Sequence, residues 1–419
     1  MKGEDMKTVL YGTIIDATGK KPIENGMIVV DGNTIEYVGK KDETYQIPKD
    51  ATVLNFSEKW LMPGMVEAHS HLAGYRSGNT LDWIITPQTI KVCQAVKDLK
   101  ALLNAGYTSV RDMGGYGCEL KRAMEQGIIE GPRIFGANAC ISQTAGHSDI
   151  WTDFTPEFIE KNDPSHVLAD GKDECRKVAR TQFRKGADFI KIMTTGGIMD
   201  TATKPYLSHY TVEEIRVFVE EAESQGTYVA THAENNEGVF NAVLGGVKSI
   251  EHGYLTDDRT LELMVKNQCF QVPTLSVMTN MLSESETLQP HVREKIKYVM
   301  EHAYESVRKS YEAGIPLAAG CDFLSCPGWC EYGMNGQELA ELVKVGLSPM
   351  EAIIAATRNG ADAILMGEKL GTLECGKLAD IIAIDQNPLE NIECMKGPEH
   401  VVFVMKEGTV VKNVQEYSE

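Results

Sequence analysis

The decisive stretch of the sequence is residues 62–71, which read MPGMVEAHSH. Its apolar residues predict a buried strand, and Pro63-Gly64 marks the point where the chain enters that strand. The strand ends in His69 and His71. Side chains two residues apart in a strand point to the same side, so these imidazoles can aim into one cavity and hold one metal ion. A His-x-His pair also arises by chance, so this interpretation depends on the residues downstream.

From Met65 onward the sequence repeats a pattern of strand, loop and helix. The candidate strands number eight: Met65–Leu72, Thr108–Met113, Arg133–Asn138, Asp188–Met193, Tyr228–Ala233, Ser249–Gly253, Cys269–Leu275 and Pro316–Asp322. The helical patterns are Thr89–Asn104, Lys172–Lys185, Val212–Gln225, Asp258–Lys266, Val292–Ala313, Gly336–Val345 and Pro349–Met366. Eight consecutive β/α units predict an α/β fold of the (β/α)8 TIM-barrel type rather than an open doubly wound sheet.

The segments on either side of this repeat have the composition of short β-sheets. The candidate strands are Val9–Ile15, Gly26–Val30, Thr34–Val38 and Thr52–Phe56 before it, and Ala379–Asp385, Val401–Met405 and Thr409–Val411 after it. Neither small sheet can bury both of its faces alone. We therefore expect residues 1–61 and 370–419 to pack together as one composite β-sandwich domain beside a barrel domain of residues 62–369.

Polar residues follow the predicted barrel strands at their C-terminal ends, where barrel enzymes keep their sites. Four of the ten histidines lie there, and with a lysine and an aspartate they form the set His69, His71, Lys191, His232, His252 and Asp322. Two histidines plus an anion on each side would suit two metal ions. Imidazole ligands favour zinc.

Lys191 and Asp322 each allow two interpretations. A charged lysine left unpaired in an apolar strand is costly, so Lys191 either forms a buried ion pair or, as a neutral amine, captures carbon dioxide. The resulting carbamate could bridge two cations about 3.5–4 Å apart, and spacing alone does not decide between these roles. Asp322 either caps a helix or ligates a metal and accepts a proton from water. Gly320 leaves room for close approach at the same rim and favours the second role.

These motifs resemble those of the amidohydrolase superfamily over nearly the whole chain. The segments that carry the resemblance are Pro63–His71, the strand of Lys191, Thr231–Ala233, Ser249–Gly253 and Gly320–Asp322. Within the superfamily the chain is most similar to the Xaa-Pro dipeptidase and arginine carboxypeptidase group, which overlaps imidazolonepropionase-like sequences. The group-level matches are Gly106–Asp112, Gly131–Arg133, Gly186–Lys191 and Val272–Leu275. Glu67 and Cys321 stand where the family usually has Asp and Thr, and neither position is a ligand.

The resemblance implies a binuclear zinc amidohydrolase that uses a hydroxide bridging the two metals. His69 and His71 would hold one zinc, and His232 and His252 would hold the other. A carbamylated Lys191 would bridge the two ions, and Asp322 would ligate the first zinc and act as general base. Residues 146–149 resemble the family's Gly-His-Gly-Asp motif, which makes His147 a candidate catalytic residue that contacts the substrate.

The same resemblance implies a small-molecule substrate, namely a dipeptide or N-acyl amino acid of the Xaa-Pro or Xaa-Arg/Lys type. Arg76 and His147 are candidate partners for its carboxylate. Glu234 lies two residues beyond His232, where dipeptidase relatives often carry Tyr or His, and its carboxylate should favour an amine or a basic side chain. The alternatives are a cyclic amide (imidazolone-type) hydrolase, a deaminase, which commonly lacks the bridging lysine, and an inactive scaffold on the same fold. The presence of all six ligand positions argues against the scaffold.

Composition and charge exclude other partners. The net charge of −19 over 419 residues argues against nucleic acid and anionic membranes, and no apolar run reaches about 18 residues. The ten cysteines form no disulfide framework and no signal peptide is evident, so we expect a cytoplasmic protein with reduced thiols. The role of the crowded set Cys321, Cys326 and Cys330 stays open. We also expect a homo-oligomer, and we place His166, His291, His302 and His400 at the surface.

Overall fold

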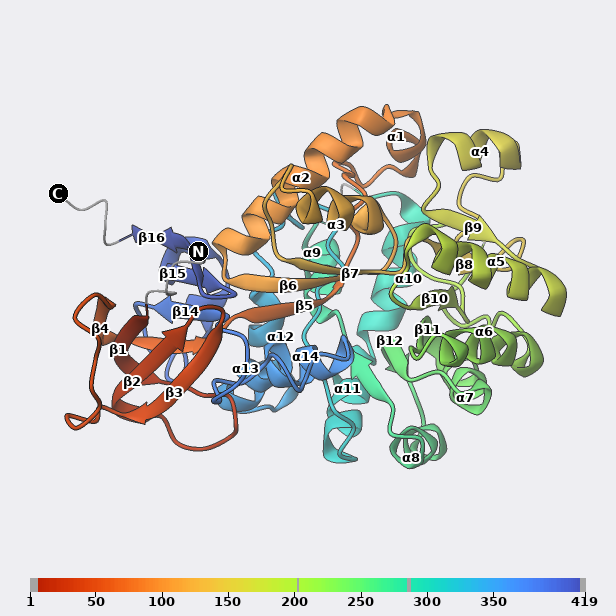
Figure 1. Cartoon of the computed structure of the whole chain (residues 1–419). Helices are drawn as coiled ribbons and strands as arrows, with labels where there is room; N and C mark the ends of the chain where they lie inside the picture. Colours follow the sequence, from red (N-terminus) through yellow and green to blue (C-terminus); the bar gives the residue numbers. More distant parts are fainter. Residues whose placement is uncertain (1–6, 202, 285–287, 415–419) are drawn as a thin grey trace.

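The computed structural model describes residues 7–201, 203–284 and 288–414, and its named strands fall into three sheets (Figure 1). One sheet gathers strands from both ends of the chain, and the other two are parallel sheets from the middle of the chain. In Figure 1 the first and last strands, red and blue, lie together at one side of the molecule. Helices flank the parallel strands.

The terminal sheet has seven strands in the order β16-β15-β14-β4-β1-β2-β3. Their bounds are β1 Thr8–Ile14, β2 Ile23–Asp31, β3 Thr34–Lys40, β4 Thr52–Pro63, β14 Ile381–Ile384, β15 Val401–Lys406 and β16 Thr409–Asn413. The two halves of the chain meet where β14 pairs antiparallel with residues 60–63 of β4. The structure thus unites the two terminal segments as expected, but in one sheet instead of two separate ones. β4 also runs beyond the predicted domain limit at residue 61.

The terminal sheet curls so that its β3 edge approaches the segment that leads into β14. The backbone N–H of Ala379 donates to the carbonyl of Asn33, and that of Gly408 donates to Ala379, although four strand positions separate β3 from β14. The enclosed core includes Phe56 and Phe403, whose ring centroids are 5.0 Å apart. One strongly curved sheet therefore buries its inner face without a second sheet.

The parallel strands form a six-stranded sheet in the order β13-β12-β11-β10-β8-β9 and a three-stranded sheet in the order β5-β6-β7. Their bounds are β5 Met65–Ser70, β6 Tyr107–Asp112, β7 Arg133–Gly136, β8 Cys140–Ser142, β9 His166–Leu168, β10 Ile190–Met193, β11 Val229–Asn235, β12 Ser249–Leu255 and β13 Phe270–Val272. Seven of these correspond to predicted strands, whereas β8 and β9 are additional.

The eighth predicted strand is an extended segment that connects the two parallel sheets. Leu317 forms a parallel bridge with Gln271 of β13, and Phe323 forms one with Ser70 of β5. On the opposite side the N–H of Asp188, just before β10, donates to Gly136 of β7 at 2.7 Å. This is an arrangement of the TIM-barrel type, and it brings the C-terminal ends of β5, β10, β11 and β12 to one rim.

Helices follow most strands, and their ends carry recognisable caps. The bounds are α1 Thr80–Ile85, α2 Gln88–Asn104, α3 Gly117–Glu125, α4 Pro156–Asn162, α5 Gly171–Lys185, α6 Val212–Ser224, α7 Asn236–Gly245, α8 Asp258–Lys266, α9 Leu275–Ser283, α10 Pro290–Met300, α11 Ala303–Glu312, α12 Gln337–Val345, α13 Pro349–Ala356 and α14 Arg358–Ala363, with short 3-10 turns at Ile392–Met395 and Pro398–His400. Thr211 with Glu214, and Ser348 with Glu351, form capping boxes at the starts of α6 and α13.

Two predicted helices are each broken into two. Val292–Ala313 divides into α10 and α11 at residues 301–302, which lets α11 place Ser306 within 3.1 Å of the Gly253 carbonyl at the end of β12. Pro349–Met366 divides at Thr357, whose φ of −126° and ψ of −85° leave the helical region. Helical periodicity continues through both breaks, so the sequence pattern does not reveal them.

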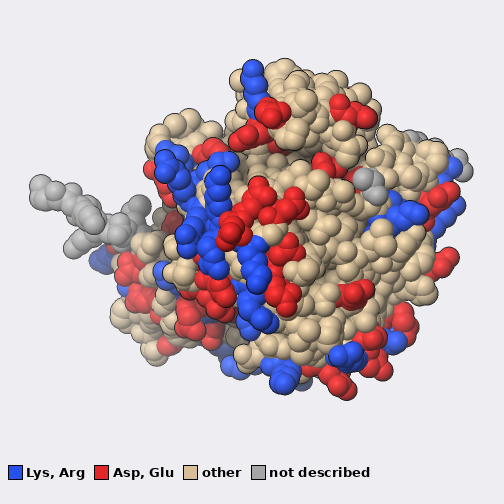
Figure 2. Space-filling model, turned by 90° about the vertical axis from the view of Figure 1, so that its right-hand side faces the viewer, with Lys and Arg blue, Asp and Glu red and all other residues tan. Residues whose placement is uncertain are grey.

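Charged side chains on the face shown in Figure 2 gather in neighbouring basic and acidic bands. The basic residues of α5 pair with the acidic residues of α6, as in Arg176–Glu220 at 2.9 Å and Arg180–Glu221 at 2.8 Å. These ion pairs join two neighbouring helices. Among the described residues, no helix has the length and apolar character needed to cross a bilayer.

Candidate functional site

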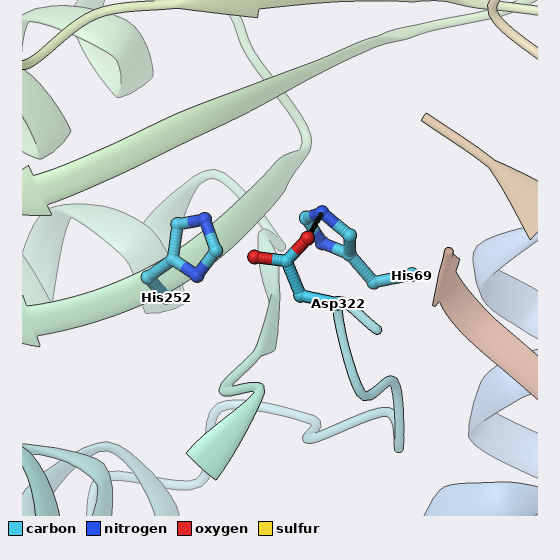
Figure 3. A group of neighbouring side chains, drawn as sticks. All are labelled: His69, His252 and Asp322. Carbon is cyan, nitrogen blue, oxygen red and sulfur yellow. Dashed lines mark ion pairs between the residues drawn. The ribbon is translucent and has the colours of Figure 1, made fainter. Parts of the chain in front are cut away.

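The six predicted ligand residues line one cavity at the C-terminal rim of the parallel strands. Asp322 Oδ1 lies 3.1 Å from His71 Nε2 and 3.4 Å from His69 Nε2. Figure 3 shows His69, His252 and Asp322 turned toward one another from three segments, and their ligand atoms all lie within 4.8 Å of one another. The rings of His232 and His252 are 4.5 Å apart. The structure thus brings together the residues that the sequence placed at separate strand ends.

The hydrogen bonds of the four histidines fit a metal site, because each ring uses one nitrogen to bond a residue outside the proposed ligand set and turns the other toward the cavity or toward Asp322. The committed nitrogens and their partners are His69 Nδ1 with Glu251 at 2.7 Å, His71 Nδ1 with the Gly114 carbonyl at 3.0 Å, His232 Nε2 with the Gly196 carbonyl at 3.1 Å and His252 Nδ1 with Thr274 Oγ1 at 2.8 Å. The second nitrogen of His69, Nε2, is buried without a hydrogen-bond partner in the described chain. Such an orphaned nitrogen beside a carboxylate suits a cation.

A buried ion pair inside the rim orients His69. Arg111, on β6, is fully buried and donates to both oxygens of Glu251 at 3.0 Å. It also donates to Tyr228 and Ser249 at 3.1 and 3.0 Å, so its guanidinium is well satisfied. Because Glu251 in turn bonds His69, this pair fixes the ring orientation and tautomer of a proposed ligand. Arg111 and Glu251 both lie in the family-like segments, but no local sequence pattern distinguishes them as supports of a ligand.

Glu67 explains why the chain tolerates a departure from the family pattern. Its Oε1 accepts the backbone N–H groups of His69 and Cys321, each at 2.9 Å, and its Oε2 accepts from Asn335 at 2.7 Å. The longer glutamate therefore ties the backbone of the first strand to the segment that carries Asp322. Burial raises the pKa of Glu67 to about 7, while these hydrogen bonds oppose that shift.

Three residues at the rim adopt left-handed backbone conformations that non-glycine residues rarely use. Their φ angles are +71° at His252, +57° at Asp322 and +53° at Thr274. Such strain persists only where surrounding contacts hold it, and it concentrates at functional sites. Here two of the three are proposed metal ligands and the third, Thr274, bonds His252.

Lys191 lies in the middle of β10 and is only 1% exposed. None of the described residues forms a hydrogen bond or a close ion pair with its Nζ, in contrast to the buried Lys91, which pairs with Asp163 at 2.9 Å. Burial lowers the pKa of Lys191 from its ordinary value. The buried ion pair that the sequence left open is therefore absent from the described contacts, and the amine faces the cavity.

His147 is held over the site by the loop that follows β10. Its Nδ1 lies 2.7 Å from Asp200 Oδ2, and its ring centroid lies 4.3 Å from that of His232, with the two rings tilted by 30°. Lys295 of α10 secures the same loop by donating to the carbonyls of Gly197 and Asp200 at 2.9 and 2.6 Å. Nε2 of His147 is thereby the nitrogen left for the cavity. Asp200 and Lys295 had no distinguishing signal in the sequence, because their role depends on the folded loop.

Glu234 also lines the cavity, on β11, and is 2% exposed. Its Oε2 is buried without a hydrogen-bond partner among the described residues. Burial raises the pKa of Glu234 well above its ordinary value, in spite of the opposing charge of Lys295. The structure thus places this predicted substrate-contacting residue in the cavity wall.

Two other predictions come out differently. Arg76 does not line the cavity, because its guanidinium is engaged by Asp98 at 2.9 and 3.2 Å and by two backbone carbonyls. The surface placement of His166 is wrong: this side chain is 11% exposed and lines the cavity. It sits on β9, a strand that was not predicted.

The three clustered cysteines are buried free thiols. Burial raises the pKa of Cys326 to about 12 and also raises those of Cys321 and Cys330. Cys321 donates to the Asn335 carbonyl at 3.0 Å. The thiols therefore pack as small apolar groups, and only Cys330 reaches the cavity wall.

The remaining wall of the cavity is mostly apolar. The cavity encloses about 890 Å³ including its open mouth, and its large apolar lining residues are Tyr75, Trp83, Ile150, Met193, Ile198, Met199, Val277, Met278, Met281, Leu324 and Trp329. Glu234 and Asp322 are the only carboxylates among the described lining residues. The site thus combines a polar floor with walls that suit an apolar group.

Comparison with known proteins gives a consistent set of relatives. The Amidohydrolase family model matches residues 60–411. The chain is 33% identical to ochratoxinase from Aspergillus niger over 97% of this chain and 86% of that protein. It is 30% identical to a prolidase complexed with N-methylphosphonate-L-proline, with a TM-score of 0.91, and 30% identical to a Xaa-Pro dipeptidase with methionine bound in the active site, with a TM-score of 0.88. Both structural comparisons cover 97% of this chain and 100% of the other.

Proposed function

We propose that this chain, which belongs to the amidohydrolase family, is a binuclear metal enzyme that cleaves the amide bond of a dipeptide or an N-acyl amino acid. It is a hydrolase acting on carbon–nitrogen bonds, as its family and its relatives show. The observation that carries the finer proposal is that six side chains converge on one cavity. They are four histidines that each turn one ring nitrogen toward the cavity, a buried lysine without an ion pair among the described residues, and an aspartate.

The proposed ligands divide into two groups by position. His69 and His71 of the first strand with Asp322 would hold one divalent ion, and His232 with His252 would hold the other. A carbamate on Lys191 would supply the shared anion, and the absence of a described ion pair at Nζ supports a neutral amine that can form it. Two ions bound there would polarise the scissile carbonyl and acidify water at neutral pH. Zinc suits this imidazole-rich ligand set.

The chain's own residues supply the proton transfers and the positioning. Asp322 lies within 3.1–3.4 Å of two ligand imidazoles, so it is well placed to accept a proton from the attacking water and return it to the leaving nitrogen. His147, oriented by Asp200, would contact the substrate through Nε2. The strained φ angles at His252 and Asp322 support a preorganised site.

The walls of the cavity favour an apolar substrate. Methionine and tryptophan side chains dominate the lining, and Glu234 is the only carboxylate besides Asp322 among the lining residues that the structure describes. Of the expected substrate types, Xaa-Pro is therefore supported more directly than Xaa-Arg/Lys. The prolidase and dipeptidase relatives agree with this choice.

A matched panel of dipeptides tests the proposal. We expect Leu-Pro and Leu-Phe to be hydrolysed faster than Leu-Arg, and Leu-Asp to be slowest, with kcat/KM values spanning at least about tenfold. Lys191→Ala should abolish turnover and lower the bound metal, whereas Lys185→Ala, at the exposed end of α5, should change neither. Opening of an imidazolone ring without cleavage of any dipeptide would contradict the proposed reaction.

A further inference from the structure

The cavity wall contains one acidic group whose environment is not explained by the fold. Glu234 is 2% exposed, and its Oε2 has no hydrogen-bond partner in the described chain. Its Oε1 lies 3.6 Å from His232 Nε2, but that nitrogen is already within 3.1 Å of the Gly196 carbonyl. A buried carboxyl without a partner costs free energy, so its retention calls for a ligand that satisfies it.

Lys295 is the cation whose charge acts most strongly on Glu234, but its ammonium group is already bound to other residues. Lys295 donates to the carbonyls of Gly197 and Asp200, and its Nζ forms an ion pair with Asp200 Oδ1 at 3.9 Å. Within the described residues no lysine or arginine comes within 4.0 Å of Glu234. A positively charged group from outside the chain would therefore meet a carboxyl that no lysine or arginine of the described chain already pairs.

The position of Glu234 indicates which part of a substrate it would meet. It lies two residues after His232 on β11, and its backbone N–H is fixed by Thr195 Oγ1 at 3.0 Å. The carboxyl thus lies beside the Nε2 edge of the His232 ring and lines the same cavity as the proposed ligands. It can therefore reach a group attached next to a scissile carbonyl that is bound at those ligands. In a dipeptide the group attached next to that carbonyl is the α-carbon bearing the free ammonium. An N-acyl amino acid has an uncharged carbon there.

We propose that Glu234 binds the ammonium of the substrate's N-terminal residue, so that the site selects dipeptides with a free amine over N-acyl amino acids. This inference rests on the proposed function and narrows it. A charge-assisted hydrogen bond to a buried carboxylate is stronger than a neutral one, and it would satisfy the orphaned Oε2 directly. The apolar walls then remain available for the side chain of that residue.

The test compares leucyl-proline with 4-methylpentanoyl-proline, which differs only by lacking the ammonium. We expect the wild-type enzyme to favour leucyl-proline by about 10- to 100-fold in kcat/KM. In Glu234→Gln this ratio should fall toward one. Glu237→Gln, on the exposed first turn of α7, should keep the wild-type ratio. Metal content and melting temperature of each variant show that the site is intact.

Two outcomes would overturn the inference: equal rates of the wild-type enzyme on the two substrates, or an unchanged ratio in Glu234→Gln. Calorimetric binding of the same two compounds separates this failure from failure of the proposed function. If neither compound is hydrolysed but leucyl-proline binds more tightly to the wild type than to Glu234→Gln, the reaction is wrong and the ammonium site stands. If the two proteins bind leucyl-proline equally, the ammonium site is rejected whatever the reaction.

Discussion

At the scale of single residues, the proposed ligands could be predicted and their supports could not. His69 and His71 follow from the two-residue period of a strand, and His232, His252 and Asp322 follow from their positions at strand ends. Glu251 bonds His69, which is 182 residues away in the sequence, and Asp200 bonds His147, which is 53 residues away. No local sequence pattern specifies such contacts. His166 was misplaced for the same reason, because β9 gains its burial from pairing with β8.

Removal of one hydroxyl oxygen tests whether Thr274 orients His252. Thr274→Val keeps the shape of the side chain but removes the Oγ1 that bonds His252 Nδ1 at 2.8 Å. Loss of this orienting bond should lower the affinity for metal by about 10-fold or more, because outer-shell partners fix the ligand ring. Titration against a competing chelator measures the change, with Thr279→Val on α9 as the control. Equal affinity in Thr274→Val and wild type would remove Thr274 from the site.

At the scale of elements, the site depends on loops and helix ends rather than on strands alone. The loop after β10 holds His147 and His232 through Asp200 and Gly196, and α10 secures it through Lys295. Glu338 of α12 caps the start of α9 by accepting the N–H groups of Leu275 and Ser276 at 3.0 and 2.7 Å. The presence of the helices could be predicted from the periodicity of apolar residues. The breaks within the predicted helices 292–313 and 349–366 could not, because they depend on tertiary packing.

The cap at Glu338 predicts a pH dependence of stability. Burial raises the pKa of Glu338 to about 8, well above its ordinary value of 4.5. Between these values the folded state binds the proton more tightly than the unfolded state, so this group's contribution to the unfolding free energy falls as pH rises, by at most about 1.4 kcal/mol per pH unit. Glu338→Gln cannot ionise and should lose this dependence.

Chemical denaturation between pH 5 and 8 checks this expectation. The unfolding free energy of Glu338→Gln minus that of the wild type should become more positive as pH increases. The exposed Glu262→Gln on α8 should show a constant difference from the wild type. A constant difference for Glu338→Gln as well would mean that Glu338 titrates normally.

At the scale of the whole molecule, the two ends of the chain complete one structural unit beside the parallel strands. The repeat of strand and helix predicted the architecture around the cavity, and the β-rich ends predicted their association. The curl of the terminal sheet could not be predicted, because it arises from long-range contacts between the β2–β3 turn and the β15–β16 turn. Gly408 shows this closeness: a Cβ added there would lie 2.0 Å from the Gly32 carbonyl oxygen.

Two glycine substitutions test whether the β2–β3 turn and the β15–β16 turn are in contact. Gly408 and Gly376 both have left-handed φ angles, +75° and +88°, but a Cβ on Gly376 would meet nothing within 4 Å. Gly376→Ala should therefore cost only backbone strain, about 1 kcal/mol of unfolding free energy. Gly408→Ala adds a backbone clash and should cost about 2 kcal/mol more. Urea unfolding of both variants compares the costs, and equal values would show that the turns are not in contact in solution.

Titration of metal-free protein with zinc, monitored by hydrolysis of leucyl-proline, tests most directly whether this chain is a metal-dependent amide hydrolase with its ligands at the strand ends. We expect no hydrolysis without metal and a rate that increases until about two ions are bound per chain. Full hydrolysis by the metal-free chain would contradict this expectation.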